Sequence, residues 1–303
     1  MTNGSISTEA MPGRLPPVVC VVLNWNGWRD TIPCIESLAA QDYPALHVLV
    51  VDNASTDDSV ERIRAAFPST ELLQSDANRG FAAGCNLGIR LALERGAAFV
   101  WLLNNDTVAP PDTLTKLVAA ASSPKIGIVG TVLRYAHNPA EIQAWGGGSI
   151  VRWIGFATHF LAPSALGPNS FLTFASVLLR RELLETVGLL DEGFFMYFED
   201  ADLCFRARDA GWQLAVAPGT AVLHKEGGTA GRDKSPRFDR IVTASGLRFL
   251  HRHGRPRLTS LGLFVLSRLG KRMVRADFAG LRAVLRGTLD WWHDSPLAFQ
   301  RKP

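Results

Sequence analysis

The chain has 303 residues, 47% of them hydrophobic and 20% charged, with a net charge of +4. This is enough to bury a sizeable core, in one large α/β domain or in a domain with an appendage. The longest apolar stretches, at 171–179 and 261–266, fall short of the roughly 20 residues of a membrane-spanning helix, which excludes a protein that crosses the bilayer.

Residues 1–17 are rich in Gly, Pro and Ser and contain no apolar run. This composition predicts a disordered lead-in and not a signal peptide, so we expect a cytoplasmic protein. The cysteines lie far apart, without the spacing of a metal or redox site, and we expect buried thiols in a reducing compartment. They are Cys20, Cys34, Cys85 and Cys204.

The charge is unevenly distributed along the chain. Residues 232–303 contain 16 Lys and Arg against 5 Asp and Glu, a net charge of +11, whereas residues 1–231 carry −7. This asymmetry indicates two regions with different tasks, an acidic body and a basic C-terminal extension.

The first part of the body alternates four times between apolar, β-branched runs and helical patterns. Such runs are typical of parallel strands buried on both faces. The alternation predicts an α/β fold with an open, mostly parallel central sheet flanked by helices. We expect strands at 18–24, 47–52, 71–75 and 98–104, and helices at 28–40, 55–66, 81–95 and after Pro110-Pro111.

The elements that follow are less regular. Strand-like runs separated by loops precede a helix, two short strands and, after a glycine-rich stretch at 227–231, three helical patterns in the basic extension. The strands are expected at 126–133, 149–154, 171–179, 214–217 and 221–224, and the helices at 199–210, 238–253, 258–275 and 278–292.

Polar residues follow three of the first four strands. They are Asn24, then Asp52-Asn53, then Asn104-Asn105-Asp106. Because the carboxyl ends of parallel strands meet at one edge of a sheet, we expect these groups to share a cleft. Each of them alone is also an ordinary turn or helix-cap residue.

A cleft of this kind suits a nucleotide diphosphate, whose negative charge a divalent cation can offset. Asp106 is the candidate anchor for the cation, with Asn104 and Asn105 as neutral oxygen ligands or ribose contacts. Asp52 is suited to accept a hydrogen bond from a base or a ribose hydroxyl.

The helix expected at 81–95 opens with Asn78, Gly80, Gly84 and Gly88. Glycines at intervals of four along a helix allow close approach of a ligand, and they equally allow tight packing on a strand. The series is not the GxGxxG of a dinucleotide fold, which argues against a dehydrogenase.

An aromatic run at 194–198 leads directly into Glu199, Asp200 and Asp202 at a helix start. Carboxylates are common in a first helical turn because they oppose the helix dipole. Partial desolvation by the aromatic rings would raise the pKa of such a carboxyl and make it a better base.

Two further residues have two interpretations each. His224, which follows a strand, is either a metal ligand or a structural histidine. Trp145, which precedes Gly146 to Gly148, either stacks on a sugar or marks a tight turn.

Five segments in order resemble the bacterial family 2 glycosyltransferases of the GT-A fold, most closely their rhamnosyltransferase-like branch. The segments are VVLNWNG at Asn24, VVDNASTDDS at Asp52, NRGFAAGCNLGI at Asn78, LLNNDT at Asp106 and FEDADLCFRARDAGW at Asp200, followed by His224. The resemblance covers about 18–231 and implies a nucleotide-binding half at 18–109, an acceptor-binding half at 110–231 and an added helical extension at 232–303.

The resemblance also implies a role for each site residue. Asn24, Asp52, Asn78 and Gly80 would line the donor pocket, and Asn104, Asn105 and Asp106 would stand where the family has its Asp-x-Asp motif. Asp106 and His224 would hold Mg2+ or Mn2+, and Asp200 would be the catalytic base. Glu199, Asp202 and Trp145 would contact the acceptor or support the site. The departure from the family pattern is Asn104 in the first motif position, which weakens the anchorage of the ion.

Members of this family invert the anomeric centre in one in-line displacement. The implied reaction moves L-rhamnose from dTDP-rhamnose to a saccharide or polyprenyl-diphosphate-linked glycan in cell-envelope polysaccharide synthesis. The alternatives are transfer of a hexose or N-acetylhexosamine from UDP, and a scaffold protein that only binds a nucleotide sugar. The presence of both Asp106 and Asp200 argues against a protein that only binds a nucleotide sugar, because such a protein needs no catalytic base.

The basic extension has two interpretations. Its apolar residues Leu258, Leu261, Val265, Leu269 and Met273 share one helical face, beside Arg268, Lys271, Arg272 and Arg275, and Trp291-Trp292 follow. A basic amphipathic helix of this kind suits the surface of an anionic membrane, which would make the protein peripheral at the inner face of the cell membrane. Alternatively, these helices pack on the catalytic domain or on a second subunit in a homodimer. No recognition motif accompanies the charge, so we expect no nucleic acid partner.

Overall fold

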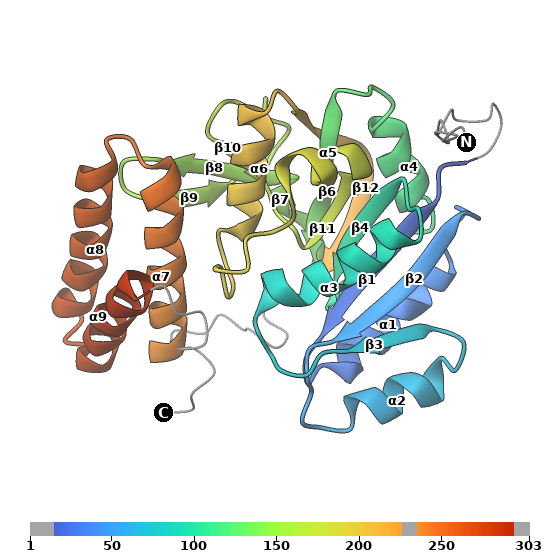
Figure 1. The fold of residues 1–303 in the computed structure, drawn as a ribbon, viewed down its shortest axis with the longest axis horizontal. Helices are drawn as coiled ribbons and strands as arrows, with labels where there is room; N and C mark the ends of the chain where they lie inside the picture. Colours follow the sequence, from blue (N-terminus) through green and yellow to red (C-terminus); the bar gives the residue numbers. More distant parts are fainter. Residues whose placement is uncertain (1–14, 226–234, 294–303) are drawn as a thin grey trace, which may run out of the picture.

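The computed structural model describes residues 15–225 and 235–293. Most of the lead-in expected at 1–17 lies outside these residues, as does the glycine-rich stretch at 227–231. Within the described residues, an α/β body adjoins a bundle of three C-terminal helices (Figure 1).

The first four strands follow the predicted alternation and are parallel to one another, in the order β3-β2-β1-β4. In the register of the first pair, Asn24 lies opposite Asp52, so the polar strand ends meet at one edge of the sheet. The strands are β1 (Val18–Asn24), β2 (Leu46–Asp52), β3 (Glu71–Gln74) and β4 (Phe99–Asn104), connected by α1 (Trp28–Ala39), α2 (Ser59–Ala66) and α3 (Phe81–Glu94).

Strands from later in the chain extend this sheet beyond β4. The order continues β4-β11-β6-β12-β5, with β7 beside β6. β11 is antiparallel to both of its neighbours, whereas β12 is parallel to β6. The added strands are β5 (Thr107–Val108), β6 (Ile126–Tyr135), β7 (Asn138–Trp145), β11 (Ser176–Arg180) and β12 (Gln213–His224).

Two strand predictions in this half were wrong in detail. The apolar run at 171–179 is divided between β11 and β10 (Ser170–Leu172), which belongs to a separate small sheet with β8 (Gly147–Val151) and β9 (Phe156–His159). The two strands expected at 214–217 and 221–224 are one strand, β12, with an irregularity between Ala217 and Val222. Hydrophobicity alone marks the buried residues and does not show where the chain changes sheets.

The glycines of α3 serve tight packing. A Cβ atom at Gly84 would lie 2.5 Å from Leu23 Cδ1, and one at Gly88 would lie 2.4 Å from Val21 Cγ1. Gly80 has a φ of +97°, and a Cβ atom there would lie 2.1 Å from the carbonyl oxygen of Phe195. Only glycine therefore fits where the aromatic segment crosses the start of α3.

The helices of the second half cover the sheet and form the C-terminal bundle. α7 packs against both other helices of the bundle and against α6 of the body. None of the described helices combines the length and the apolar character that crossing a membrane requires. The helices are α4 (Thr113–Ala120), α5 (Arg181–Val187), α6 (Glu199–Asp209), α7 (Pro236–His253), α8 (Arg257–Val274) and α9 (Phe278–Trp292).

The basic extension is partly folded onto itself, which corrects the expected single apolar face. Leu261 and Val265 pack on the core, whereas Leu258 and Met273 are exposed. Arg268 and Arg272, which the sequence places beside this apolar face, both form ion pairs with the buried Asp239 of α7. The four cysteines are buried and free, as expected.

Candidate active site

The polar ends of β1 and β2 form a buried hydrogen-bond cluster. Asn24 Nδ2 donates to Asp52 Oδ1 at 2.7 Å, and Ser55 donates to both carboxylate oxygens of Asp52, from Oγ at 2.6 Å and from its backbone N–H at 2.9 Å. Asn24 Oδ1 accepts from Thr31 Oγ1 at 2.8 Å.

This cluster corrects our expectation that Asn24 and Asp52 contact a donor directly. Both side chains are fully buried, and neither lines the neighbouring cavity. Their hydrogen-bonding atoms are already engaged by the protein. The pair therefore fixes the edge of the sheet and the turn that follows β2.

A cavity of about 710 Å³ opens above this edge of the sheet. It is bounded by the ends of β1, β2 and β4, by the small sheet, by the start of α6 and by α7. Of the residues expected in the site, eight line it: Asn78, Gly80, Asn104, Asn105, Asp106, Glu199, Asp200 and His224. The structure thus brings residues from four separate segments of the chain together.

Asn53, which the sequence placed beside Asp52 at this strand end without a role of its own, lines this cavity next to the buried Asp52. Its Nδ2 donates to Asn78 Oδ1 and to the carbonyl oxygen of Gly80, both at 3.1 Å. Its Oδ1 is buried and has no hydrogen-bond partner among the described residues. Asn53 therefore offers an acceptor to a ligand in the cavity.

The loop after β4 is held from below by α1. Asn105 Nδ2 donates to Thr31 Oγ1 at 2.9 Å, and Thr107 Oγ1 donates to the carbonyl oxygen of Asn104 at 2.7 Å. These contacts fix the backbone on both sides of Asp106.

Asp106 and His224 face each other across the pairing of β5 with β12. The register pairs His224 with Thr107, the residue after Asp106. His224 Nε2 lies 3.2 Å from Asp106 Oδ1, and the two side chains are 13% and 11% exposed. The pair therefore remains accessible from the cavity.

Gln143 orients this histidine from behind. Its Oε1 lies 2.8 Å from His224 Nδ1. A proton on Nδ1, donated to Gln143, leaves the lone pair of Nε2 on the side of Asp106, as a metal ligand requires. Within the described residues no cluster of three or more His, Cys, Asp or Glu side chains forms a complete metal site. Among the described residues, Asp106 and His224 are therefore a pair of candidate ligands, an oxygen and a nitrogen.

Asp200 and Glu199 enter the cavity at the start of α6. The two residues before them, Tyr197 and Phe198, have φ angles of +72° and +70°. Left-handed backbone at two bulky residues costs roughly 1–3 kcal/mol each and is kept where surrounding structure enforces it. This turn points the first carboxylates of the helix into the cavity.

The environments of these two carboxyls differ. Burial raises the pKa of Asp200 to about 6, although backbone N–H groups, among them that of Ala201 at 2.7 Å, oppose the rise. Burial and the neighbouring Asp200 raise the pKa of Glu199 well above its usual range, and its Oε2 has no partner among the described residues. With a pKa of about 6, Asp200 is ionised near neutral pH and able to accept a proton.

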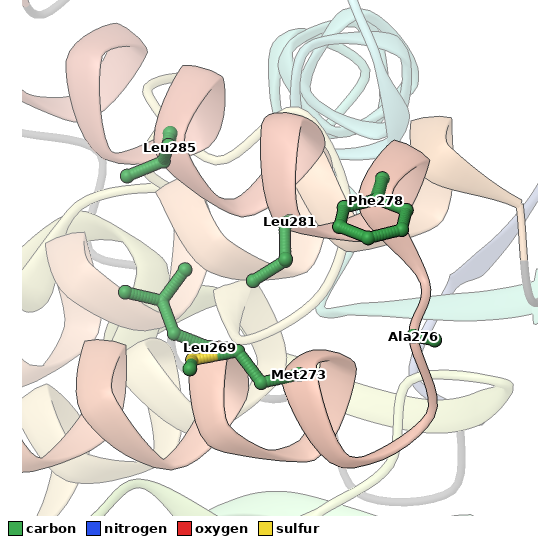
Figure 2. Close-up of a pocket in the computed structure, with 6 residues that line it drawn as sticks. All are labelled: Leu269, Met273, Ala276, Phe278, Leu281 and Leu285. Carbon is green, nitrogen blue, oxygen red and sulfur yellow. The ribbon is translucent and has the colours of Figure 1, made fainter.

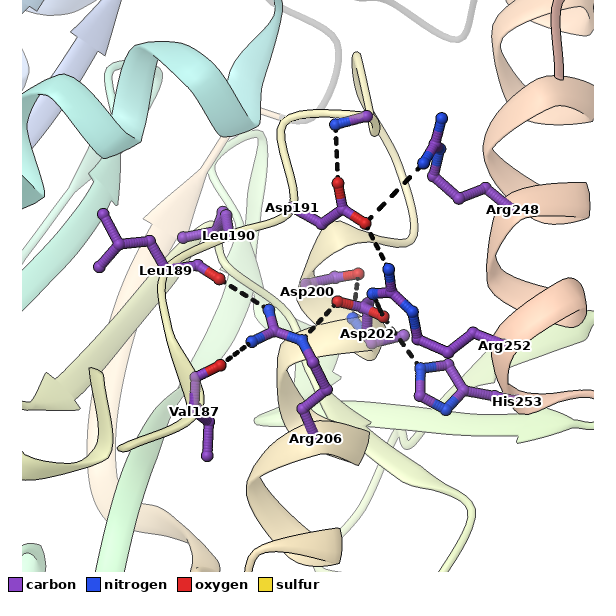
Figure 3. A network of polar contacts seen from close by, with 12 residues as sticks. Val187, Leu189, Leu190, Asp191, Asp200, Asp202, Arg206, Arg248, Arg252 and His253 are labelled. Carbon is purple, nitrogen blue, oxygen red and sulfur yellow. Dashed lines mark hydrogen bonds and ion pairs between the residues drawn. The ribbon is translucent and has the colours of Figure 1, made fainter. Parts of the chain in front are cut away.

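Asp202, two residues after Asp200, does not line the cavity and is fully buried. Figure 3 shows it between Arg206 of its own helix and Arg252 and His253 of α7. The distances to these partners are 2.8, 2.6 and 2.9 Å. Burial alone would raise the pKa of Asp202, but the hydrogen bond from His253 and the two guanidinium groups lower it. Asp202 supports the site by tying α6 to α7 and does not contact an acceptor.

Replacing Asp202 with Asn is expected to reduce the free energy of unfolding by about 3 kcal/mol, because it removes the buried carboxylate to which Arg206, Arg252 and His253 all bond. Since the folded-state pKa is lowered, the contribution is present above about pH 4 and is lost as the pH falls through the folded value. Urea denaturation at neutral pH measures the loss. The control is Asp58→Asn, which removes an exposed ion pair with Arg62 and should leave the urea midpoint of unfolding unchanged. An equal effect of the two substitutions would contradict this role of Asp202.

Trp145 lies at the end of β7, opposite Val132, and does not line the cavity. Gly146 follows it with a φ of +75°. The structure therefore supports the tight-turn interpretation and not contact with a sugar.

α7 contributes to the cavity, although the sequence assigned it to a separate extension. Arg237, Phe238, Ile241 and Val242 line one wall, and the Arg237 guanidinium lies 5.8 Å from the centre of the Trp25 ring. Arg237 adds a positive charge to a site otherwise rich in carboxylates. Its only signal in the sequence is the excess of basic residues beyond 232.

Comparison with known proteins agrees with this architecture. The sequence model described as "Glycosyltransferase like family 2" matches residues 16–236. An N-acetylglucosaminyl-diphospho-decaprenol L-rhamnosyltransferase of Mycobacterium tuberculosis is 30% identical over 242 residues, which are 72% of this chain and 78% of that protein. The O-antigen biosynthesis protein RfbC of Myxococcus xanthus is 26% identical over 75% of this chain and 19% of its own length.

Solved structures share the fold at low sequence identity. The mannosyltransferase PcManGT from Pyrobaculum calidifontis, in complex with GDP-Man and Mn2+, gives a TM-score of 0.59 at 16% identity and covers 94% of this chain and 89% of that one. TarS of S. aureus, residues 1–349, gives 0.57 at 17% identity over 93% and 82%. The chain therefore belongs to glycosyltransferase family 2 and has the GT-A fold.

Proposed function

We propose that this protein transfers L-rhamnose from dTDP-L-rhamnose to a saccharide or polyprenyl-diphosphate-linked glycan of the cell envelope, with inversion at the anomeric carbon. The observation that supports it best is the meeting of Asp200 with the Asp106–His224 pair in one cavity. The choice of sugar and acceptor is supported by the name of the mycobacterial relative.

The donor binds, in this proposal, with its diphosphate at Asp106 and His224. These residues would hold Mg2+ or Mn2+, and a carboxylate oxygen beside an imidazole nitrogen suits such an ion when phosphate oxygens complete its shell. The bound ion would offset the charge that develops on the leaving diphosphate. Arg237 adds positive charge from α7.

The nucleoside lies over the ends of β1 and β2. The free Oδ1 of Asn53 accepts a hydrogen bond from the imide N–H of the base, because a buried acceptor without a partner is costly unless a ligand satisfies it. Asn78 holds Asn53 in place, and Asn24 and Asp52 support the turn from below.

The acceptor enters beside the aromatic wall near α6. Asp200 takes the proton of the acceptor hydroxyl as its oxygen bonds to C1 of the sugar and the bond from C1 to the diphosphate breaks. Burial and the neighbouring Asp200 raise the pKa of Glu199, which favours its neutral form beside Asp200.

The test is the initial rate with a panel of donors and a polyprenyl-diphosphate-linked N-acetylglucosamine acceptor. We expect dTDP-L-rhamnose to react at least about tenfold faster than UDP-N-acetylglucosamine, UDP-galactose or GDP-mannose. A chelator should abolish turnover, and Mn2+ or Mg2+ should restore it. Preference for a UDP sugar would overturn the choice of donor, whereas unchanged turnover in the chelator would overturn the metal-dependent mechanism.

A further inference from the structure

The outer faces of α8 and α9 are apolar and exposed. Leu258, Leu266 and Met273 of α8 are exposed by 79%, 65% and 66%. These residues are eight and seven residues apart, a spacing that places them on one side of the helix. The same side includes Gly262 and carries no charged residue between Leu258 and Met273. Water therefore meets an uncharged helix face about four turns long.

α9 presents a similar stripe. Phe278, Leu285, Leu289 and Trp292 follow at intervals of seven, four and three residues and are exposed by 71%, 52%, 57% and 74%. This spacing places all four on one side of the helix. The opposite side of α9 is buried through Gly280, Ala283, Val284 and Gly287.

The two stripes meet in a shallow groove of about 410 Å³. Figure 2 shows Leu269 and Met273 of α8 facing Leu281 of α9 across it, with Phe278 and Leu285 alongside. The lining consists entirely of apolar residues. Exposed apolar patches of this extent mark a surface that binds a protein or a lipid.

Charges distinguish between these partners. Five exposed cations on the two helices form no ion pair with any described residue: Arg257, Lys271, Arg275, Arg282 and Arg286. The two acidic residues of the segment are both engaged, Asp277 with Arg272 and Asp290 with Arg240. Arg282 and Arg286 lie directly beside the apolar stripe of α9, on the same helix face.

We propose that the α8–α9 face docks on an anionic lipid surface, with the apolar stripes among the acyl chains and Arg282 and Arg286, which flank the stripe of α9, at the headgroups. Leucine, phenylalanine and tryptophan on one side and unpaired cations beside them are the arrangement of helices that lie in a membrane interface. A second copy of this chain is a poor partner, because a twofold interface would bring these cations against one another.

Docking of the α8–α9 face on lipid would also explain how the protein reaches a lipid-linked acceptor. This link rests on the proposed function. α7 joins the docking surface to the cavity, since its Asp239 binds Arg268 and Arg272 of α8 while its Ile241 lines the cavity. The docked protein would take its acceptor from the lipid surface on which it lies.

The test is co-sedimentation of the full chain with vesicles, in the absence of any donor, so that it is independent of the sugar chemistry. We expect binding to phosphatidylcholine vesicles that contain about one third phosphatidylglycerol, weakened by salt, and little binding to phosphatidylcholine alone. The Arg282→Glu/Arg286→Glu variant should bind at least about tenfold more weakly. Leu285→Ser/Leu289→Ser should also weaken binding, with less dependence on salt.

The matched control is Arg64→Glu/Lys125→Glu, which makes the same change in net charge at exposed positions of the body. It should bind like the wild type, and thermal unfolding should be alike for all variants. Three results would overturn the proposal: no binding of the wild type to anionic vesicles, equal loss in the control, or a stable dimer in light scattering that the α9 variants dissociate. Donor turnover in solution without vesicle binding would reject the docking surface and leave the proposed function standing.

Discussion

Asp200→Asn is expected to lower kcat about a thousandfold, within the range of 10² to 10⁴ for the loss of a general base. The amide keeps the shape of the side chain but cannot take the proton of the acceptor hydroxyl. Donor affinity should be unchanged, because in the proposed mechanism Asp200 contacts the acceptor hydroxyl and not the donor. Steady-state kinetics and calorimetry of the donor separate the two effects.

The pH dependence adds a second check on Asp200. Because burial raises its pKa to about 6, the base form is lost below this value and predominates above it. The wild-type kcat/KM should therefore rise with pH with the slope of one proton and level off above about 6. Asp209→Asn, at the exposed C-terminal end of the same helix, is the matched control and should keep both rate and profile. Wild-type activity in Asp200→Asn would exclude it as the base.

Asp106→Asn is expected to lower kcat/KM about a thousandfold and to remove the effect of the metal on donor binding. The carboxylate is the anionic member of the pair with His224, and loss of a metal's charge stabilisation costs several kcal/mol in the transition state. Calorimetry of the donor with Mn2+ and with a chelator measures the coupling. The wild type should bind more tightly with Mn2+, and the variant should bind equally under both conditions.

A suitable control for Asp106 is Asp112→Asn, which removes an ion pair with Lys116 on the surface of α4. It should retain the full metal effect. Donor binding by Asp106→Asn that is still strengthened by Mn2+ to the wild-type extent would show that the cation is held elsewhere.

The first half of the fold could be predicted because its signals are local. Three of the first four strands, β1, β2 and β4, are apolar runs whose buried residues fill both faces. The order of the later strands could not be predicted, because β11 joins β4 to β6 through contacts distant in the sequence. The split of 171–179 between two sheets has the same cause.

At the end of β2 the sequence pointed to Asp52 as the donor contact, whereas Asn53 is the residue that lines the cavity. Neighbouring residues of an extended chain point to opposite sides, so a shift of one residue decides which side chain reaches the cavity. Asp52 points toward Asn24 and Ser55, and Asn53 reaches the cavity. The polar residues Asp52 and Asn53 correctly indicated where β2 ends, but the sequence did not show which way either side chain points.

That α7 lines the cavity could not be predicted from the sequence, for a different reason. Charge excess marks a basic extension but does not distinguish cations that pair internally from those that face solvent or a ligand. Arg268 pairs with Asp239, whereas Arg237 lines the cavity. The difference depends on tertiary packing, which no local pattern encodes.

The measurement that tests the central claim most directly is the anomeric configuration of the sugar in the product, determined by NMR after reaction of the wild-type protein with its nucleotide donor. A single displacement in which Asp200 activates the acceptor predicts a configuration opposite to that of the donor. A product that retains the configuration of the donor would contradict the mechanism.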